Sequence, residues 1–320
     1  MLVSKKTRAG SLKPEMIRGW FKVIRRRFVK LVMLLPFAKE TKEPFKAVKG
    51  VSLELSSGMI GLLGPNGAGK TTIMRTLCGI LDQSYGKIFI NGFDTADYRE
   101  ELQGLIGYLP QEFGTYENMT ALEFLDYQAI LKNITDETVR EERVRYVLKS
   151  VHMWERRNNK IGAYSGGMKQ RIGIAMILLH LPRILVVDEP TAGLDPRERI
   201  RFRNLLVELS RERVVVFSTH IIEDISSSCN QVAVMSKGAL RYWGEPRDMV
   251  NIAKGKVWQV EVSPHEVEEM TQRFTVIHHM NQGGQVRLRC LSSEKPDNRA
   301  VEVTAVLEDS YLWLLNSVCP

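Results

Sequence analysis

The chain has 320 residues, of which 44% are hydrophobic and 26% charged, a composition that excludes collagen-like and wholly disordered proteins and suits about two domains. The net charge of +8 is concentrated at the start: residues 1–50 hold 14 basic and 3 acidic side chains, and the rest of the chain holds 31 and 34. A protein that binds nucleic acid over its whole surface would not have this asymmetry. No apolar stretch approaches the ~20 residues that cross a bilayer. Four cysteines without a CxxC pair favour a reducing, cytosolic setting over a zinc site or a disulfide framework.

The first predicted element is an amphipathic helix over residues 14–35. Its apolar residues recur at helical spacing, and Pro14 and Pro36 suit its two ends. Three interpretations remain open: contact with a membrane surface, packing against protein, and a nucleic-acid-binding arm. In the membrane interpretation, aromatic residues face the acyl region and cations face anionic headgroups. The aromatic residues are Trp20, Phe21 and Phe28, and the cations are Arg18, Lys22, Arg25, Arg26 and Arg27.

From Ala47 the pattern changes to short apolar strands separated by helices, which predicts an α/β fold with a parallel sheet. A hairpin is expected around Lys237-Gly238, and residues 115–158 are dominated by helical periodicity. The strands are expected at 51–55, 59–63, 87–90, 105–109, 184–187 and 214–217, and two further helices at about 69–80 and 197–210.

Residues 256–320 predict a smaller α+β unit. A strand at 257–262 and a helix at 264–271 precede a hairpin around Gly283-Gly284, and a helix is expected over 301–316. The unit has no phosphate-binding or carboxylate motif. Two roles remain open: it regulates or stabilises a dimer, or it covers apolar surface of the main body.

The phosphate-binding motif follows the second strand. Residues 64–71 match G-x-x-x-x-G-K-[ST] between a predicted strand and a predicted helix, the setting of a P-loop. Glycines allow backbone N–H groups to surround phosphate oxygens, and the helix N-terminus adds positive potential. Lys70 is expected to reach the β- and γ-phosphates, and Thr71 to bind Mg²⁺. The predicted nucleotide-binding residues are Gly64, Pro65, Asn66, Gly67, Ala68, Gly69, Lys70, Thr71 and Thr72.

Two carboxylates follow the buried strand at 184–187. The carboxyl end of such a strand lies beside the P-loop in folds of this kind. We therefore expect Asp188 to hold Mg²⁺, and Glu189 to act as the general base that polarises the attacking water.

Four further motifs occur in the order found in ATP-binding cassette (ABC) ATPases. The segment Tyr164–Arg171 resembles their signature motif, Gln111 their Q-loop glutamine, Asp195 their D-loop aspartate and His220 their switch histidine. The resemblance extends from about residue 47 to 249. It implies a P-loop NTPase cassette, with a RecA-like parallel-sheet core and a helical subdomain at about 112–165.

The resemblance also implies that two cassettes enclose two ATP molecules. Ser165, Gly166 and Gly167 of one copy would contact the ATP of the other, and Asp195 is also expected among the nucleotide-binding residues. His220 would stabilise transition-state charge, and Gln111 would contact Mg²⁺ or the attacking water. Two departures stand out: Met168 replaces the usual glutamine of the signature, and the aromatic residue that stacks on adenine is not clearly placed. Phe45 is the preferred candidate, with Phe37 as the alternative.

The segment 108–125 and the tail resemble the cassettes of bacterial drug, lantibiotic and lipid exporters. This implies an ATPase subunit with Mg²⁺ and ATP as cofactors, a second cassette (a homodimer is expected), a separate transmembrane permease and no nucleic acid. The location would be cytoplasmic, on the inner face of the cell membrane. The alternative is an ABC ATPase that acts on ribosomes or nucleic acid. The expected domains are 1–46, a basic extension; 47–255, the cassette; and 256–320, the small α+β unit.

Overall fold

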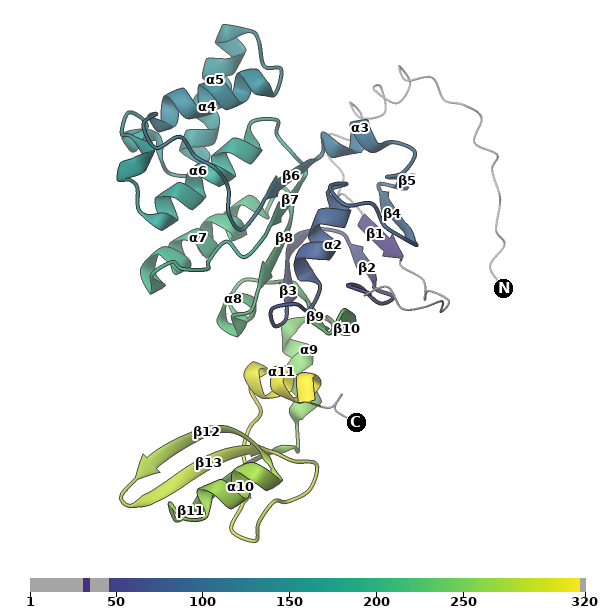
Figure 1. The fold of residues 1–320 in the computed structure, drawn as a ribbon, viewed down its shortest axis with the longest axis vertical. Helices are drawn as coiled ribbons and strands as arrows, with labels where there is room; N and C mark the ends of the chain where they lie inside the picture. Colours follow the sequence, from purple (N-terminus) through teal and green to yellow (C-terminus); the bar gives the residue numbers. More distant parts are fainter. Residues whose placement is uncertain (1–30, 35–45, 317–320) are drawn as a thin grey trace, which may run out of the picture.

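The structure, a computed structural model, describes residues 31–34 and 46–316. Its centre is a six-stranded sheet in the order β10-β9-β3-β8-β7-β6, with five parallel strands and β10 antiparallel at one edge (Figure 1). The parallel strands are mostly continuous apolar runs, as expected for a sheet that is covered on both faces. The bounds are β3 (Gly58–Leu63), β6 (Ile106–Leu109), β7 (Ile184–Val187), β8 (Val214–Thr219), β9 (Gln231–Ser236) and β10 (Ala239–Gly244).

The two faces of this sheet belong to different apolar cores. Successive residues of a strand point to opposite faces, so Leu185 and Val187 join one buried cluster while Ile184 and Val186 join the other. The longer helices that contribute to the first cluster on this face include α4 (Ala121–Leu131), α5 (Glu137–Ser150), α6 (Gly166–Leu178) and α7 (Pro196–Leu209). The second cluster includes α2 (Lys70–Leu77). Shorter helical elements are α3 (Arg99–Gln103), η1 (Trp154–Arg156), η2 (Ile161–Ala163) and α8 (Ile222–Ser226).

The helical region expected between residues 112 and 165 contains α4 and α5, which Figure 1 shows beside α6 and away from α2. Both helices begin at residues that satisfy free N–H groups. Thr120 and Glu123 form a reciprocal capping box at α4, and Asp136 accepts the N–H of Val139 at α5.

A second, antiparallel sheet contributes to the core around α2. Its order is β2-β1-β4-β5, with β1 (Leu31–Leu34), β2 (Ser52–Leu55), β4 (Lys87–Ile90) and β5 (Phe93–Asp94). The helix predicted over 14–35 is therefore wrong at its end, because residues 31–34 form a strand. A short apolar run fits a strand or a helix equally well, and here β2 and β4 pair with it on both sides. The rest of that predicted helix, Phe37 and Phe45 lie outside the described residues.

A third, antiparallel sheet belongs to the C-terminal unit. Its order is β12-β13-β11-β14, with β11 (Val257–Val262), β12 (Thr275–Gln282), β13 (Gln285–Leu291) and β14 (Val301–Glu302). The helices of this part of the chain are α9 (Pro246–Val250), η3 (Asn251–Ala253), α10 (Val267–Arg273) and α11 (Leu307–Asn316). The helix predicted over 301–316 is too long, because residues 301–302 pair with β11 and the helix begins only at Leu307.

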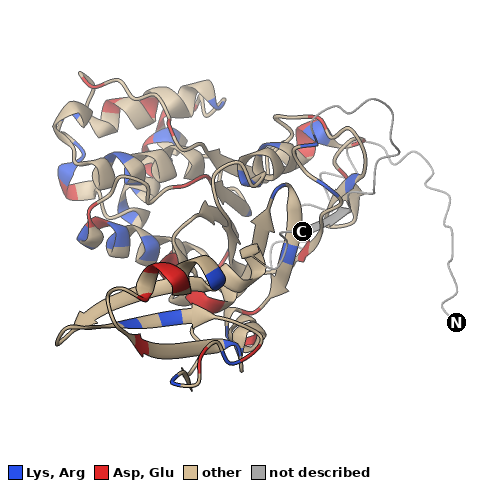
Figure 2. Ribbon diagram, turned by 60° about the horizontal axis from the view of Figure 1, so that its bottom comes forward, with Lys and Arg blue, Asp and Glu red and all other residues tan. Residues whose placement is uncertain are grey.

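Helix α11 joins the small sheet to the main body. Arg289 of β13 donates two hydrogen bonds, of 2.9 and 2.6 Å, to the buried carboxylate of Asp309, and Figure 2 shows basic residues on this sheet near acidic residues of the helix. Leu307 and Tyr311 belong to the same apolar cluster as Met249 and the helices on the main sheet. The helix therefore covers apolar surface of the body. In the described parts of the chain, no helix combines the length and the apolar character needed to cross a bilayer.

Candidate active site

The P-loop connects β3 to α2. Gly69 precedes the helix with φ = +99°, and a Cβ there would lie 2.6 Å from the Ala47 carbonyl oxygen, so only glycine fits. Gly67 also has positive φ, but a Cβ at this position would meet nothing within 4 Å. The loop is therefore packed tightly where it meets the body and open on the side of Gly67, as a phosphate-binding loop requires.

Lys70 is the first residue of α2, and its side chain is only 5% exposed. The ammonium group donates to the carbonyl oxygens of Gly64 and Pro65, at 2.7 and 3.3 Å, and lies 3.3 Å from Oε1 of Glu189. A buried cation must be paired, and here its partners are the loop itself and the proposed general base. The carboxyl end of β7, which the sequence is expected to place beside the P-loop, therefore lies against the lysine of that loop. Thr71 and Thr72 follow in the same first turn of the helix.

The hydroxyl of Ser218 holds the two carboxylate residues at the end of β7. It donates to Oδ1 of Asp188 at 2.6 Å and accepts the N–H of Glu189 at 2.8 Å. Glu189 has φ = +43°, a conformation that costs free energy in a residue with a side chain and is common at functional sites. Its Oε2 lies 3.4 Å from Nδ1 of His220, which follows β8. One carboxylate therefore contacts both the lysine and the switch histidine.

A thiol and a phenol lie close enough to Asp188 for its charge to act on them. Burial, and then the negative charge of Asp188, raise the pKa of the Cys78 thiol to about 12. Burial also raises the pKa of the Tyr108 phenol. Asp188 itself donates its N–H to the carbonyl of Leu109 at 2.9 Å, so the end of β6 lies beside it. Gln111, two residues further along, is exposed at this same edge of the sheet.

The signature and D-loop residues form a second group. Ser165 caps α6 by accepting the N–H of Met168, and Asp195 caps α7 by accepting two N–H groups. A Cβ on Gly166 would lie 3.3 Å from Leu194, and one on Gly167 would lie 2.4 Å from Oε2 of Glu198. The two helices therefore begin side by side. Ser165 and Gly166 are exposed, whereas Gly167 is buried against α7.

Four buried residues of this region, Thr191, Ser218, Thr219 and Asp224, have no role that the sequence motifs assign. Ser218 joins Asp188 to Glu189, and Asp224 accepts hydrogen bonds from the hydroxyls of Thr191 and Thr219. The one local signal is the position of these hydroxyls next to assigned residues: Ser218 and Thr219 directly precede His220. Nothing in the sequence identifies Asp224 as their partner.

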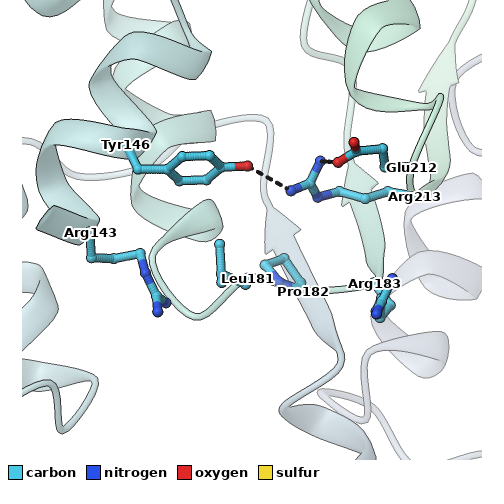
Figure 3. A pocket seen from close by; sticks show the side chains of 7 residues that line it. All are labelled: Arg143, Tyr146, Leu181, Pro182, Arg183, Glu212 and Arg213. Atoms are coloured by element: carbon cyan, nitrogen blue, oxygen red, sulfur yellow. Dashed lines mark hydrogen bonds and ion pairs between the residues drawn. The ribbon is translucent and has the colours of Figure 1, made fainter. Parts of the chain in front are cut away.

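A hollow of about 410 Å³ lies at the opposite end of the sheet, where β7 and β8 begin. Three arginines and Glu212 line it (Figure 3). Arg143 donates to the carbonyl of Leu179 at 2.6 Å, and Arg213 donates to the phenol of Tyr146 and lies 3.8 Å from Glu212. The hollow contains none of the predicted nucleotide-binding residues.

Comparisons with known proteins agree with this geometry. Residues 48–192 match the family described as ABC transporter. The ABC transporter ATP-binding protein YxlF of Bacillus subtilis (strain 168), which is uncharacterised, is 38% identical over 85% of this chain and 95% of its own length. The chain belongs to the ABC transporter ATP-binding proteins. As an ABC ATPase it binds and hydrolyses ATP, so the predicted family, cassette fold and activity are confirmed.

Other relatives support the same assignment. This ABC chain is 33% identical to the probable multidrug ABC transporter ATP-binding protein YbhF of Escherichia coli (strain K12) over 84% of its length, but it spans only about half (49%) of YbhF. Among solved structures, a dimeric ATP-binding cassette in a post-hydrolysis state with ADP and phosphate is 26% identical, with a TM-score of 0.57, and the match covers 68% of this chain and 98% of that one. The cbiO1 protein of Clostridium perfringens, part of the transporter complex cbiONQ, matches with a TM-score of 0.61 and 27% identity over 68% of this chain and 89% of its own.

Proposed function

We propose that this ABC chain is the ATPase subunit of an exporter, that two copies of it enclose two ATP molecules, and that it drives a separate transmembrane permease. The observation that carries the proposal is the contact of one carboxylate, Glu189, with both Lys70 and His220 beside an open P-loop. The site therefore brings together three groups that ATP hydrolysis needs: a cation for the phosphates, a base for the attacking water and a histidine for the charge that develops.

The P-loop, residues 64–72, would hold the ATP phosphates, with Lys70 directed at the β- and γ-phosphates. The donors suited to Mg²⁺ are oxygens, and the region offers a hydroxyl, a carboxylate and an amide from Thr71, Asp188 and Gln111. Mg²⁺, when bound, would neutralise phosphate charge. Phe45 remains the proposed adenine-stacking residue.

Hydrolysis would begin with a water molecule between Glu189 and the γ-phosphate. The water oxygen bonds to the γ-phosphorus, the bond to the bridging oxygen of ADP breaks, and the water proton passes to the Glu189 carboxylate. His220 stands 3.4 Å from that carboxylate and would stabilise the charge that develops on the transferred phosphoryl group. The products are ADP and phosphate.

The second group of residues supports the two-copy arrangement. Ser165 and Gly166 are exposed at the start of α6, beside the exposed Asp195 that begins α7. A helix N-terminus with free N–H groups favours an anion, so this surface would face the γ-phosphate of the ATP held by a second copy. The solved dimeric cassette with ADP and phosphate is a relative in which two cassettes associate.

The surface proposed for the permease lies on α4. Tyr127, Ile130 and Leu131 are exposed there at helical spacing, and Tyr116, which follows the Gln111 segment, contacts Tyr127 with ring centroids 6.1 Å apart. An exposed apolar group of this kind suits a protein partner. YbhF is described as a probable multidrug transporter protein, which supports export as the direction of transport. The chain would then lie on the cytoplasmic face of the membrane. The relatives do not favour an ATPase that acts on ribosomes or nucleic acid, and residues 47–255 and 256–320 remain the proposed domains.

The test is a pair of variants of the full chain. Glu189→Gln should retain ATP binding, reduce turnover by roughly 10²–10⁴, and accumulate a nucleotide-bound dimer, because the general base is lost. Lys70→Ala should instead lose ATP affinity. Phosphate release measures the first effect, titration with a fluorescent nucleotide the second, and light scattering the dimer. Near-normal turnover of Glu189→Gln would refute the assigned base.

A further inference from the structure

Asp224 of α8 is a buried carboxylate to which neither the family match nor the proposed mechanism assigns a role. Its side chain has 0% exposure. A charge in such a position is expensive unless it is paired and hydrogen-bonded. The residues that pair with Asp224 therefore indicate the role of this buried carboxylate.

The partners come from both loops that carry the reacting groups. Oδ2 of Asp224 accepts the hydroxyl of Thr191 at 2.8 Å and the hydroxyl of Thr219 at 3.3 Å. Thr191 lies two residues after Glu189, and Thr219 directly precedes His220. Thr219 Oγ1 also accepts the N–H of Ile221, which fixes the backbone on the other side of the histidine.

A third contact reaches α7, the helix that begins at the D-loop. Arg203 of α7 places Nη1 3.6 Å from Oδ1 of Asp224 and donates to the carbonyl of Glu223 at 3.4 Å. Among the described residues Oδ1 accepts no hydrogen bond, so this ion pair is the interaction that the structure shows for it. One carboxylate thus connects the two catalytic loops to the helix whose first turn is capped by Asp195.

We infer that Asp224 is a positioning residue for ATP hydrolysis: it holds the Glu189 loop and the His220 loop at the separation that places Glu189 Oε2 3.4 Å from His220 Nδ1. It acts through Thr191 and Thr219 and does not touch the reacting atoms. The inference rests on the roles proposed above for Glu189 and His220. Misplacement of a catalytic group by about 1 Å can reduce turnover by about 10²-fold.

The experiment compares two substitutions of Thr191 in the full chain. Thr191→Ser keeps the hydroxyl that Asp224 accepts, whereas Thr191→Val has nearly the same shape without it. Thr191→Val should reduce kcat by roughly 10–100-fold with KM and ATP affinity unchanged, and Thr191→Ser should retain most of the activity. Asp224→Asn should give a loss of kcat of the same kind. Asp309→Asn removes another buried Asp–Arg pair, in which the carboxylate accepts hydrogen bonds from Arg289 and from the N–H of Val306, and it should leave kcat unchanged.

The same substitution in a chain that already carries Glu189→Gln distinguishes a positioning role of Thr191 from a general loss of stability. Thr191→Val should change kcat by less than about threefold when Glu189 is already Gln, because the contact that it supports is then absent. The inference is overturned if Thr191→Val retains full kcat, if it reduces ATP affinity as much as kcat, or if its effect is equally large in the Glu189→Gln chain. If Asp224→Asn does not fold, the comparison of Thr191→Val with Thr191→Ser still tests the inference. Near-normal turnover of Glu189→Gln alone would instead refute the proposed function.

Discussion

Ser218→Ala tests how the structure holds its two carboxylate residues. The hydroxyl is fully buried, donates to the Asp188 carboxylate at 2.6 Å and accepts the Glu189 N–H at 2.8 Å. A hydrogen bond to a charged group contributes about 1.5–3 kcal/mol, and a buried N–H left without an acceptor costs about 1–3 kcal/mol. Since these contributions overlap, we expect the free energy of unfolding to fall by roughly 3 kcal/mol and kcat to fall about tenfold or more.

Ser310→Ala is the matched control. Ser310 is also fully buried, donates to the Val250 carbonyl at 3.0 Å and accepts the Ala253 N–H at 3.3 Å, but no charge is involved. Its loss should cost only about 1–2 kcal/mol and leave kcat unchanged. Urea unfolding in the presence of a chelator measures both stabilities without Mg²⁺, and phosphate release measures kcat. Equal losses of stability, together with normal turnover of Ser218→Ala, would refute the role assigned to this hydroxyl.

Three further outcomes are expected. Gly167→Ala should lower the melting temperature, because its Cβ would lie 2.4 Å from Glu198 Oε2, and adding Glu198→Ala should restore part of the loss; no change in melting would contradict the contact. A chain ending after Lys254 should aggregate in light scattering, since the surface under Leu307 and Tyr311 becomes exposed, and a monodisperse product would contradict this. Native Cys78, with its thiol pKa raised to about 12 by burial, should resist alkylation at pH 8 and react in urea, as mass spectrometry of its peptide would detect; rapid labelling of the native chain would contradict it.

Most of the central sheet could be predicted, because its strands are apolar runs bounded by turn residues. The run at 184–187 is buried on both faces and has the length of a strand, not of a helix. Residues 31–34 are also a short apolar run, but they follow a segment with helical spacing, and only their pairing with β2 and β4 determines the strand. Residues 301–302 likewise become a strand through β11. The local sequence pattern does not show which distant strand a short segment will pair with.

The residues of the candidate site also fall into two groups, those that the sequence predicts and those that depend on tertiary contacts. The P-loop is contiguous, so its eight positions can be recognised without the fold, and the two carboxylates follow a strand that is itself predictable. The roles of Ser218 and Asp224 depend on contacts between segments about 30 residues apart, such as the bond from Thr191 to Asp224 across 33 positions. The packing of Gly167 against Glu198 is of this kind also, and it means that substitutions of this glycine perturb the fold as well as any interface.

The position of α11 has a consequence for synthesis of the protein. Leu307 and Tyr311 complete an apolar cluster whose other members, from Met59 to Met249, are translated earlier. The stretch from Met249 to Tyr311 is about 60 residues, which a ribosome adds in roughly 3–12 s at 5–20 residues per second. During this interval the nascent cassette exposes the surface that α11 later covers. A chaperone that binds apolar surface therefore has seconds in which to act, and stalling between these two positions should prolong its association with the nascent chain.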